Sequence, residues 1–155
     1  MTDPAPLAGN AADRLAVRSL IDAWAHCADR RLPRQQAELF TADGTISVYT
    51  GPPAPGVAAV QQLRGHAEMA EAFTVLDTYD VTTHFTGQSV ITFDGDRAVG
   101  ETYCLAHHLW IEDGVRTLMV MSIRYLDTFA RRDNEWRFAD RTLVIDWTDK
   151  RPSHT

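Results

Sequence analysis

Four side chains, far apart in the sequence, are of the types that carry out acid–base chemistry: Asp29, His84, His108 and Arg141. Asp29 continues the apolar stripe of a predicted helix, where an unpaired carboxylate is costly to bury and therefore needs a partner or a role. His84, His108 and Arg141 each fall on an alternating set of residues along a predicted strand. Gathered in one apolar cavity, these groups would have shifted pKa values and could transfer protons.

Each of these residues also has a structural interpretation, which the sequence leaves open. A histidine on a strand, such as His84, is more often structural than catalytic. Because neighbouring strand residues point to opposite faces, only one of His107 and His108 can face the interior. Nearby charges offer ion-pair partners: Arg30 or Arg31 for Asp29, and Asp140, Asp127 or Glu101 for Arg141.

Metal and nucleophilic chemistry find little support in the sequence. Two histidines and a carboxylate can bind a metal ion, but no closely spaced pair such as HxxxH or HxH is present. There is no G-x-S-x-G motif, and Cys27 and Cys104 lack CxxC spacing, so we predict buried free thiols. We therefore expect neither a metal nor another cofactor.

Three helices are predicted in the first half of the chain. Asn10 can cap the first helix, which has apolar residues at three- and four-residue intervals: Val17, Leu20, Ile21, Trp24, Ala25 and Ala28. Pro33 suits the first turn of a short second helix. The third helix is predicted over residues 66–76.

The segments between these helices are predicted to form turns, loops and one strand. Asp43-Gly44 predicts a turn, followed by a strand over 45–49. Three prolines and two glycines make 51–56 a loop that could form the rim or lid of a pocket. Residues 57–63 are compatible with a helical turn or an extended segment.

From residue 81 onward the apolar period changes to two, which predicts strands over 81–93, 96–111, 116–131 and 136–147. Tight turns join them into an antiparallel meander. The strand over 96–111 has one face of mostly small residues: Ala98, Gly100, Thr102, Cys104, Ala106, His108 and Trp110. Such long strands predict a strongly bent sheet whose one face is covered by the three helices, an α+β fold with a pocket between the layers.

Length and composition predict one domain. The chain has 155 residues, 45% of them hydrophobic, and we expect a domain over 11–149 with a flexible arm at 1–10 and a tail at 150–155. The net charge of -6 argues against a nucleic-acid surface. No secretory signal and no apolar stretch of membrane-spanning length is present, so we predict a cytoplasmic protein.

Several motifs in this order resemble one family across roughly 11–149. They are HCADRR, LFTADGTISVY, LRGHAEM, TTHFTGQ, GETYCLAHH and RYLDTFARRDNEWRFADRTLVIDW. The sequence resembles the SnoaL-like family of the nuclear-transport-factor-like superfamily, which includes scytalone dehydratase, bile-acid dehydratases and hexachlorocyclohexane dehydrochlorinase. This resemblance implies a cone-shaped α+β fold in which a curved antiparallel sheet wraps over three N-terminal helices.

The resemblance also assigns roles to the four candidate residues. Asp29 and His84 match an acid–histidine pair in which the histidine takes a proton from the substrate. His108 resembles the second histidine of scytalone dehydratase. Arg141 resembles an arginine that lines the dehydrochlorinase pocket.

The chain departs from those relatives at positions that polarise their substrates. Ala28 stands where scytalone dehydratase has a tyrosine, and a second tyrosine of that enzyme falls near Val48 or Tyr49. Trp24 stands where the dehydrochlorinase has a lysine. The specific substrates of those enzymes are therefore not carried over.

These observations predict a cofactor-independent, dehydratase-like lyase or isomerase with His84 as base and Asp29 as its partner. The substrate would be a small hydrophobic ring compound of polyketide, steroid or terpenoid type. Its binding pocket would include Trp24, Tyr49, His108 and Arg141, with His108 or Tyr49 as acid. The alternative is a non-catalytic small-molecule-binding or accessory protein that uses the same pocket.

The outer face of the predicted sheet carries Tyr103, Leu105 and Leu109, which the three helices cannot cover. An exposed apolar face of this kind usually marks an interface. The resemblance points the same way, so we expect a homo-oligomer, with a trimer favoured over a dimer.

Overall fold

The computed structural model describes residues 10–154, so the predicted N-terminal arm lies outside the described residues except for Asn10. The elements follow the order α1 (Ala11–Asp29), α2 (Pro33–Glu38), β1 (Phe40–Thr50), β2 (Gln61–Arg64), α3 (Gly65–Phe73), a 3-10 helix (Thr74–Thr78), β3 (Val81–Asp94), β4 (Arg97–Glu112), β5 (Val115–Arg132) and β6 (Glu135–Pro152).

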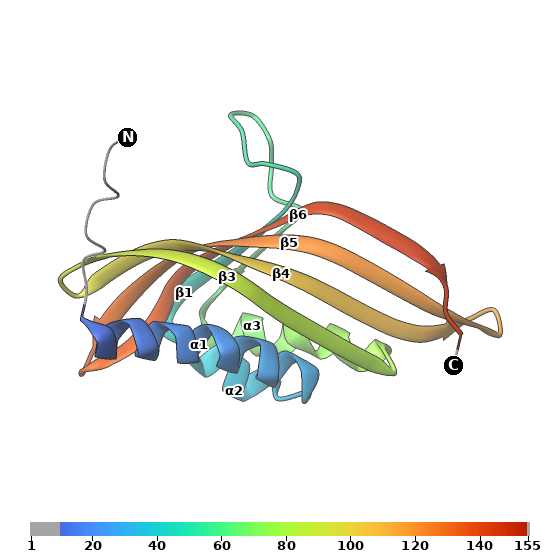
Figure 1. The fold of residues 1–155 in the computed structure, drawn as a ribbon, viewed down its shortest axis with the longest axis horizontal. Helices are drawn as coiled ribbons and strands as arrows, with labels where there is room; N and C mark the ends of the chain where they lie inside the picture. The colour runs from blue at the N-terminus through green and yellow to red at the C-terminus, as the bar shows by residue number, and fades with distance from the viewer. Residues whose placement is uncertain (1–9, 155) are drawn as a thin grey trace.

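One six-stranded sheet, with the strand order β2-β1-β6-β5-β4-β3, forms the larger layer. Strands β3 to β6 make the predicted antiparallel meander, while β1 pairs in parallel with β6. The sheet is curved and unclosed, and the three helices lie on one of its faces (Figure 1). The predicted α+β class is confirmed.

Helix α1 has the buried face that its periodicity predicts. Its backbone begins at a cap in which the side chain of Asn10 accepts a hydrogen bond from the amide of Asp13. All six apolar residues of the predicted stripe are buried. The helix ends at Asp29, which places this carboxylate at the edge of the layer between helix and sheet.

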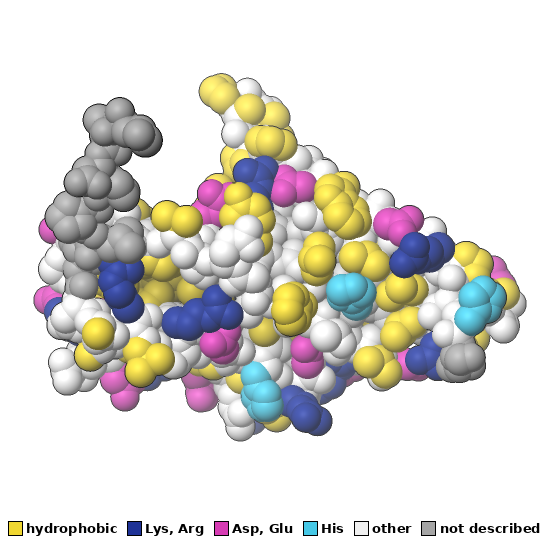
Figure 2. Space-filling view, in the orientation of Figure 1, with side chains coloured by type: hydrophobic (Ala, Val, Ile, Leu, Met, Phe, Trp, Pro, Cys, Tyr) yellow, Lys and Arg dark blue, Asp and Glu magenta, His cyan; other side chains and the backbone are white. Residues whose placement is uncertain are grey.

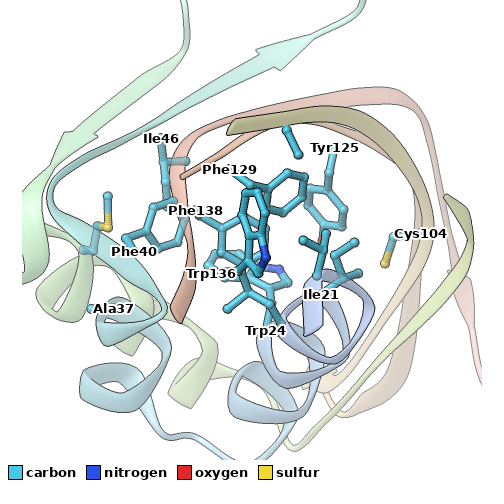
Figure 3. Packing of buried hydrophobic residues seen from close by; sticks show 14 of the residues in the cluster. Ile21, Trp24, Ala37, Phe40, Ile46, Cys104, Tyr125, Phe129, Trp136 and Phe138 are labelled. Carbon is cyan, nitrogen blue, oxygen red and sulfur yellow. The ribbon is translucent and has the colours of Figure 1, made fainter. Parts of the chain in front are cut away.

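The hydrophobic core fills the concave side of the sheet. Ile21 and Trp24 project from α1 toward Tyr125, Phe129 and Phe138 on the strands (Figure 3). The ring of Trp24 makes edge-on contacts with four aromatic rings: Phe40, Phe73, Tyr125 and Phe138. Edge-to-face pairs add to the burial of apolar area, so this aromatic cluster fixes α1 against the sheet.

The inward face of β4 is small and buried, as predicted. Ala98, Thr102, Cys104, Ala106 and His108 are all buried. Gly100 lies so close to Ile91 on β3 that a Cβ atom at this position would clash with it. Through Ala98, Cys104 and Ala106, β4 belongs to the same hydrophobic cluster as Ile21 and Trp24 of α1.

The structure differs from the sequence-based prediction around β1. The strand starts at Phe40 and runs through Asp43-Gly44, where a turn was predicted, and its register with β6 shifts between Phe40 and Thr45. The Asp-Gly pair therefore forms an irregularity within a strand. Of residues 57–63, which the sequence left open, 61–63 are extended and form β2 (Gln61–Arg64), which pairs with β1.

Two other element ends also differ. Helix α3 ends at Phe73, and a separate 3-10 helix follows it over Thr74–Thr78. The predicted third helix is therefore divided into two helices of different type. Strand β6 continues to Pro152, beyond the predicted strand end at residue 147, because it pairs with β5 as far as Thr117. Within residues 10–154, no helix is long and apolar enough to cross a membrane.

The outer face of the sheet carries a row of neighbouring residues across four strands: Phe85, Leu105, Ser122 and Trp147. We call this set the outer row. Its three large apolar side chains are exposed. Hydrophobic side chains also lie at the surface among charged ones in the view of Figure 2.

Candidate functional site

A cavity of about 250 Å³ lies between the helices and the concave face of the sheet. Most of its lining is apolar: Trp24, Ala28, Ile46, Val48, Leu63, Ala72, Phe73, Val75, Leu76, Met121, Ile123, Leu143 and Ile145. Polar groups reach it from few side chains: Gln36, Gln61, Tyr79, His84, His108 and Tyr125. An apolar pocket with a few polar groups is typical of small-molecule sites.

Asp29 and His84 form a hydrogen-bonded pair at the wall of this cavity. His84 Nδ1 lies 2.7 Å from Asp29 Oδ1, and the backbone amide of His84 donates to Asp29 Oδ2 at 2.9 Å. The hydroxyl of Thr82 donates to Asp29 Oδ1 at 3.0 Å. Helix α1 delivers the carboxylate with its last residue, while the alternation of β3 places Thr82 and His84 on the same face.

The charge of Asp29 fixes the tautomer of its histidine partner. Burial opposes ionisation of this carboxyl, but hydrogen bonds from the ring and amide of His84 and from Thr82 outweigh it and lower the pKa of Asp29. An ionised carboxylate only accepts hydrogen bonds, so Nδ1 of His84 carries the proton. In the neutral ring, Nε2 then holds the lone pair of a general base.

His108 lies beside His84 and is almost completely buried, with 2% of its surface exposed. The two imidazole rings are 5.5 Å apart between centroids and nearly perpendicular, and the ring of Tyr79 packs on His108 at 4.6 Å. Burial, followed by the charges of His84 and Arg31, lowers the pKa of His108 to about 4. His108 is therefore a neutral imidazole at pH 7, and its buried Nδ1 has no hydrogen-bond partner among the described residues.

Trp24 and Tyr125 line the cavity close to the aromatic cluster. The indole Nε1 of Trp24 is buried, and no partner for it lies within residues 10–154. Burial raises the pKa of Tyr125 and raises that of the neighbouring Cys104 thiol to about 11. Both groups are thus neutral, and Cys104 and Cys27 are buried free thiols, as predicted.

Arg141 lies in the core and is not among the residues that line the cavity. Its guanidinium makes two hydrogen bonds of 2.8 Å to Asp127, one of the three partners that the sequence offered. The guanidinium carbon lies 4.0 Å from the centroid of the Tyr125 ring and 4.6 Å from that of Trp24. Arg141 therefore packs against two side chains that line the cavity, Trp24 and Tyr125, on the side away from the cavity.

Tyr49 is also absent from the cavity lining. Its neighbour on β1, Val48, lines the cavity, and successive side chains of a strand point to opposite faces. The structure thus brings Trp24, His84 and His108 together at the cavity, with Asp29 behind His84, and leaves Tyr49 and Arg141 outside it.

Besides Gln36, Gln61 and Tyr125 of the cavity lining, three residues near the two histidines were not singled out from the sequence as functional: Thr82, Tyr79 and Arg31. Thr82 had a usable signal, since it alternates with His84 on one strand face. Tyr79 had no signal in the sequence, and Arg31 was named only as a possible ion-pair partner of Asp29. Within the described part of the chain, no group of three His, Cys, Asp or Glu side chains is arranged to hold a metal ion.

The fold and the cavity together define an α+β small-molecule-binding domain with a curved, open sheet. A family model described as "SnoaL-like domain" matches residues 9–142. The chain therefore belongs to the SnoaL-like family, as the resemblance predicted. No curated protein matches the sequence at a significant level.

Solved structures share this fold at low sequence identity. A candidate scytalone dehydratase from Novosphingobium aromaticivorans superposes with a TM-score of 0.75 at 19% identity, covering 93% of this chain and 89% of the other. Hexachlorocyclohexane dehydrochlorinase LinA-type3 from Novosphingobium barchaimii gives 0.74 at 17% identity, covering 92% and 90%. The Kfla4162 protein from Kribbella flavida gives 0.72 at 21% identity, covering 89% and 93%.

Proposed function

We propose that this protein is a cofactor-independent lyase or isomerase of dehydratase type. The observation that carries the proposal is the Asp29–His84 pair at the wall of a mostly apolar cavity. Two proteins of the same fold are named as a candidate scytalone dehydratase and a hexachlorocyclohexane dehydrochlorinase, which agrees with elimination chemistry.

In the proposed reaction, Nε2 of His84 takes a proton from a carbon atom of the substrate. Asp29 holds the ring in the productive tautomer and stabilises the imidazolium that forms. The same imidazolium can then give its proton to the departing hydroxyl, which leaves as water. Removal of a proton and a hydroxyl from one substrate molecule balances without a co-reactant.

His108 is the cavity residue best placed to assist His84. Because its low pKa keeps it neutral, His108 would bind a substrate oxygen through a hydrogen bond and would not supply a full proton. This role replaces the acid function expected for His108 or Tyr49, since Tyr49 lies on the other face of β1.

The cavity supports a small hydrophobic ring compound as substrate. Its volume of about 250 Å³ lies just below the range of roughly 300–1,000 Å³ that is usual for small-molecule sites, and two of its polar groups, His84 and His108, lie side by side on β3 and β4. A compound of polyketide, steroid or terpenoid type would place an apolar ring system against the aliphatic side chains and one oxygen near His108.

The proposal also includes a homo-oligomer joined through the outer row, with a trimer favoured over a dimer. Phe85, Leu105 and Trp147 expose apolar surface on neighbouring strands. Burial of such a row between subunits would remove it from water. Each subunit would keep its own cavity, because the cavity opens on the opposite side of the sheet.

The test starts with a panel of hydroxylated polycyclic and terpenoid compounds screened for thermal stabilisation. A ligand at 100 times its dissociation constant adds about 2.7 kcal/mol to the free energy of unfolding. Compounds that bind are then assayed for loss of water or double-bond migration, using His84→Gln beside a matched control, His26→Gln, at an exposed position on α1.

We expect His84→Gln to lower turnover by 10²–10⁴-fold, the usual contribution of a general base, and His26→Gln to leave it unchanged. A loss of less than about tenfold for His84→Gln would refute the role of this histidine. Tight binding without turnover for every compound would favour the binding-protein alternative.

A further inference from the structure

Arg31 occupies an unusual backbone position directly after α1. The amides of Arg31 and Leu32 donate to the carbonyls of Ala28 and Cys27, which is the hydrogen-bond pattern of a Schellman helix end. Arg31 itself has a positive φ of 56°, in the left-handed region where glycine is the usual residue. Because a Cβ atom is unfavourable at such a position, the presence of arginine in place of glycine points to a contribution from its side chain.

The guanidinium of Arg31 reaches back over the helix end to β3. Nη1 donates to the carbonyl of Ala28 at 2.9 Å and to the hydroxyl of Thr82 at 2.7 Å. Nη2 donates to the carbonyl of Tyr79 at 3.2 Å. A longer ion-pair contact of 3.8 Å joins Nε to the exposed carboxylate of Asp77. The Arg31 side chain therefore connects the end of α1 to Thr82 on β3 and to Tyr79 just before β3.

The contact with Thr82 sets the direction of a chain of hydrogen bonds. A guanidinium can only donate, so the Thr82 hydroxyl accepts from Arg31 and has its own proton free to donate. That proton goes to Asp29 Oδ1, the same oxygen that accepts from Nδ1 of His84. Arg31 thereby fixes the rotation of the hydroxyl that orients the carboxylate.

The contact with Tyr79 acts on the second histidine. The Tyr79 carbonyl is bound by Arg31, and the Tyr79 ring packs on His108. Tyr79 lies between the 3-10 helix and β3, where its amide donates to the carbonyl of Leu76 and the amide of Asp80 donates to Leu109 on β4, while its own carbonyl is bound by Arg31. Arg31 supplies an anchor for this segment.

We propose that Arg31 is a positioning residue that holds both histidines of the site, His84 through Thr82 and Asp29, and His108 through Tyr79. The inference deepens the proposed function and rests on it, because positioning matters for turnover only if His84 is the base. The contacts that carry it are independent of any substrate.

Three substitutions distinguish a role of Arg31 in positioning the histidines from a role only in ending helix α1. Arg31→Gly removes the guanidinium and places the preferred residue at the left-handed position, so the helix end itself should be kept or improved. Thr82→Val removes the hydroxyl with little change of shape and leaves the contact of Arg31 with Tyr79 intact. Arg30→Gly removes a neighbouring exposed arginine and serves as the matched control.

The readout is the ring ¹⁵N spectrum of the histidines at neutral pH, which distinguishes protonated from unprotonated imidazole nitrogens without a substrate. In the wild type we expect His84 to be protonated at Nδ1. In Arg31→Gly and Thr82→Val the Nδ1–H signal of His84 should shift, because the carboxylate oxygen that accepts this proton loses an oriented Thr82 hydroxyl or loses its hydrogen bond altogether.

The two variants should differ at the second histidine. Arg31→Gly should shift the ring signals of His108, whereas Thr82→Val and Arg30→Gly should leave them in place. A folded Arg31→Gly protein with unchanged His84 and His108 spectra would overturn the proposal and leave Arg31 as a helix end only. A change confined to one histidine would overturn the role for the other.

If Arg31→Gly does not fold, Arg31→Lys takes its place, since lysine keeps the charge but cannot make the forked set of contacts. Failure of this inference remains distinguishable from failure of the proposed function. Normal spectra in Arg31→Gly with activity lost in His84→Gln would refute the positioning role alone. Altered spectra with no effect of His84→Gln on turnover would refute the catalytic role alone.

Discussion

Asp29 and His84 are joined through both oxygens of one carboxylate, one bound by the imidazole ring at 2.7 Å and the other by the backbone amide at 2.9 Å. The second hydrogen bond ties the carboxylate to the strand itself, so the ring and the acid cannot move apart independently. Since α1 contributes the acid and β3 the base, the packing of helix on sheet determines the geometry of the pair.

Replacement of Asp29 by asparagine should destabilise the protein at neutral pH. We expect a loss of about 1–3 kcal/mol, since the neutral amide forms weaker hydrogen bonds with His84 and Thr82. The pKa of Asp29 is lowered in the folded protein, so its contribution is present above the unfolded value of about 4 and is lost as pH falls below it. Urea denaturation of wild type and Asp29→Asn at pH 7 and near pH 3 measures this.

The difference between the two proteins should therefore shrink in acid. An equal difference at both pH values would show that the charge of Asp29 contributes nothing to stability. Asp22→Asn, which changes an exposed carboxylate on the same helix, is the control.

His108 should make the protein sensitive to mild acid. Its folded pKa of about 4 lies below the unfolded value of about 6.5, so the unfolded chain binds the proton more readily and stability falls as pH drops between these values. The full effect is about 3 kcal/mol. Denaturation midpoints of wild type, His108→Gln and His26→Gln between pH 7 and pH 4 test it.

We expect His108→Gln to lose clearly less stability over this range than wild type. The His26→Gln control should follow the wild type. Parallel curves for all three proteins would contradict the assignment of a lowered pKa to His108.

The periodicity of single elements predicts much of this fold. The stripe of α1 and the alternation of β3 to β6 depend on local spacing, so Asn10 as cap and His108 as the inward histidine follow from the sequence. The parallel pairing of β1 with β6 joins residues about one hundred positions apart and has no local signal. For the same reason the Asp43-Gly44 pair was misread as a turn.

In the candidate site, too, the features with a local sequence pattern were predictable and those that depend on long-range pairing or an unusual backbone were not. Asp29 and His84 were predicted because a carboxylate on an apolar stripe requires a partner and because their motifs match a family. The face of Tyr49 depended on the register of β1, which the sequence did not define. The contacts of Arg31 depend on a left-handed backbone at a non-glycine residue, which no propensity predicts.

The buried ion pair between Asp127 and Arg141 should be important for stability. Both side chains have 0% exposure, and Asp127→Asn would leave the guanidinium without a counter-charge in the core. We expect a loss of about 3–5 kcal/mol. Asp146→Asn breaks an arginine–aspartate pair near the surface of the same sheet and should cost at most about 1 kcal/mol.

Guanidinium chloride denaturation of both variants gives the comparison. Equal losses would contradict the view that Arg141 acts as a buried structural cation. The result also bears on the cavity, since Arg141 packs behind Trp24 and Tyr125.

The outer row makes the last prediction, which concerns assembly. Leu105 is 40% exposed and pairs directly across the sheet with Phe85 and Ser122, and Ser122 in turn pairs with Trp147. Leu105→Glu would place a carboxylate in the centre of the proposed interface, once in every subunit. An unpaired buried charge of this kind costs several kcal/mol, so the variant should be monomeric.

Light scattering at micromolar concentration measures the outcome. We expect a wild-type mass near three times the 17.3 kDa of one chain and a mass near one chain for Leu105→Glu. Leu15→Glu makes the same change on the exposed side of α1, where 67% of the leucine surface is accessible, and should keep the wild-type mass. A wild-type protein near 17.3 kDa would refute the oligomer, and a mass near twice that value would favour the dimer. If Leu105→Glu keeps the wild-type mass, the subunits must associate through a surface other than the outer row.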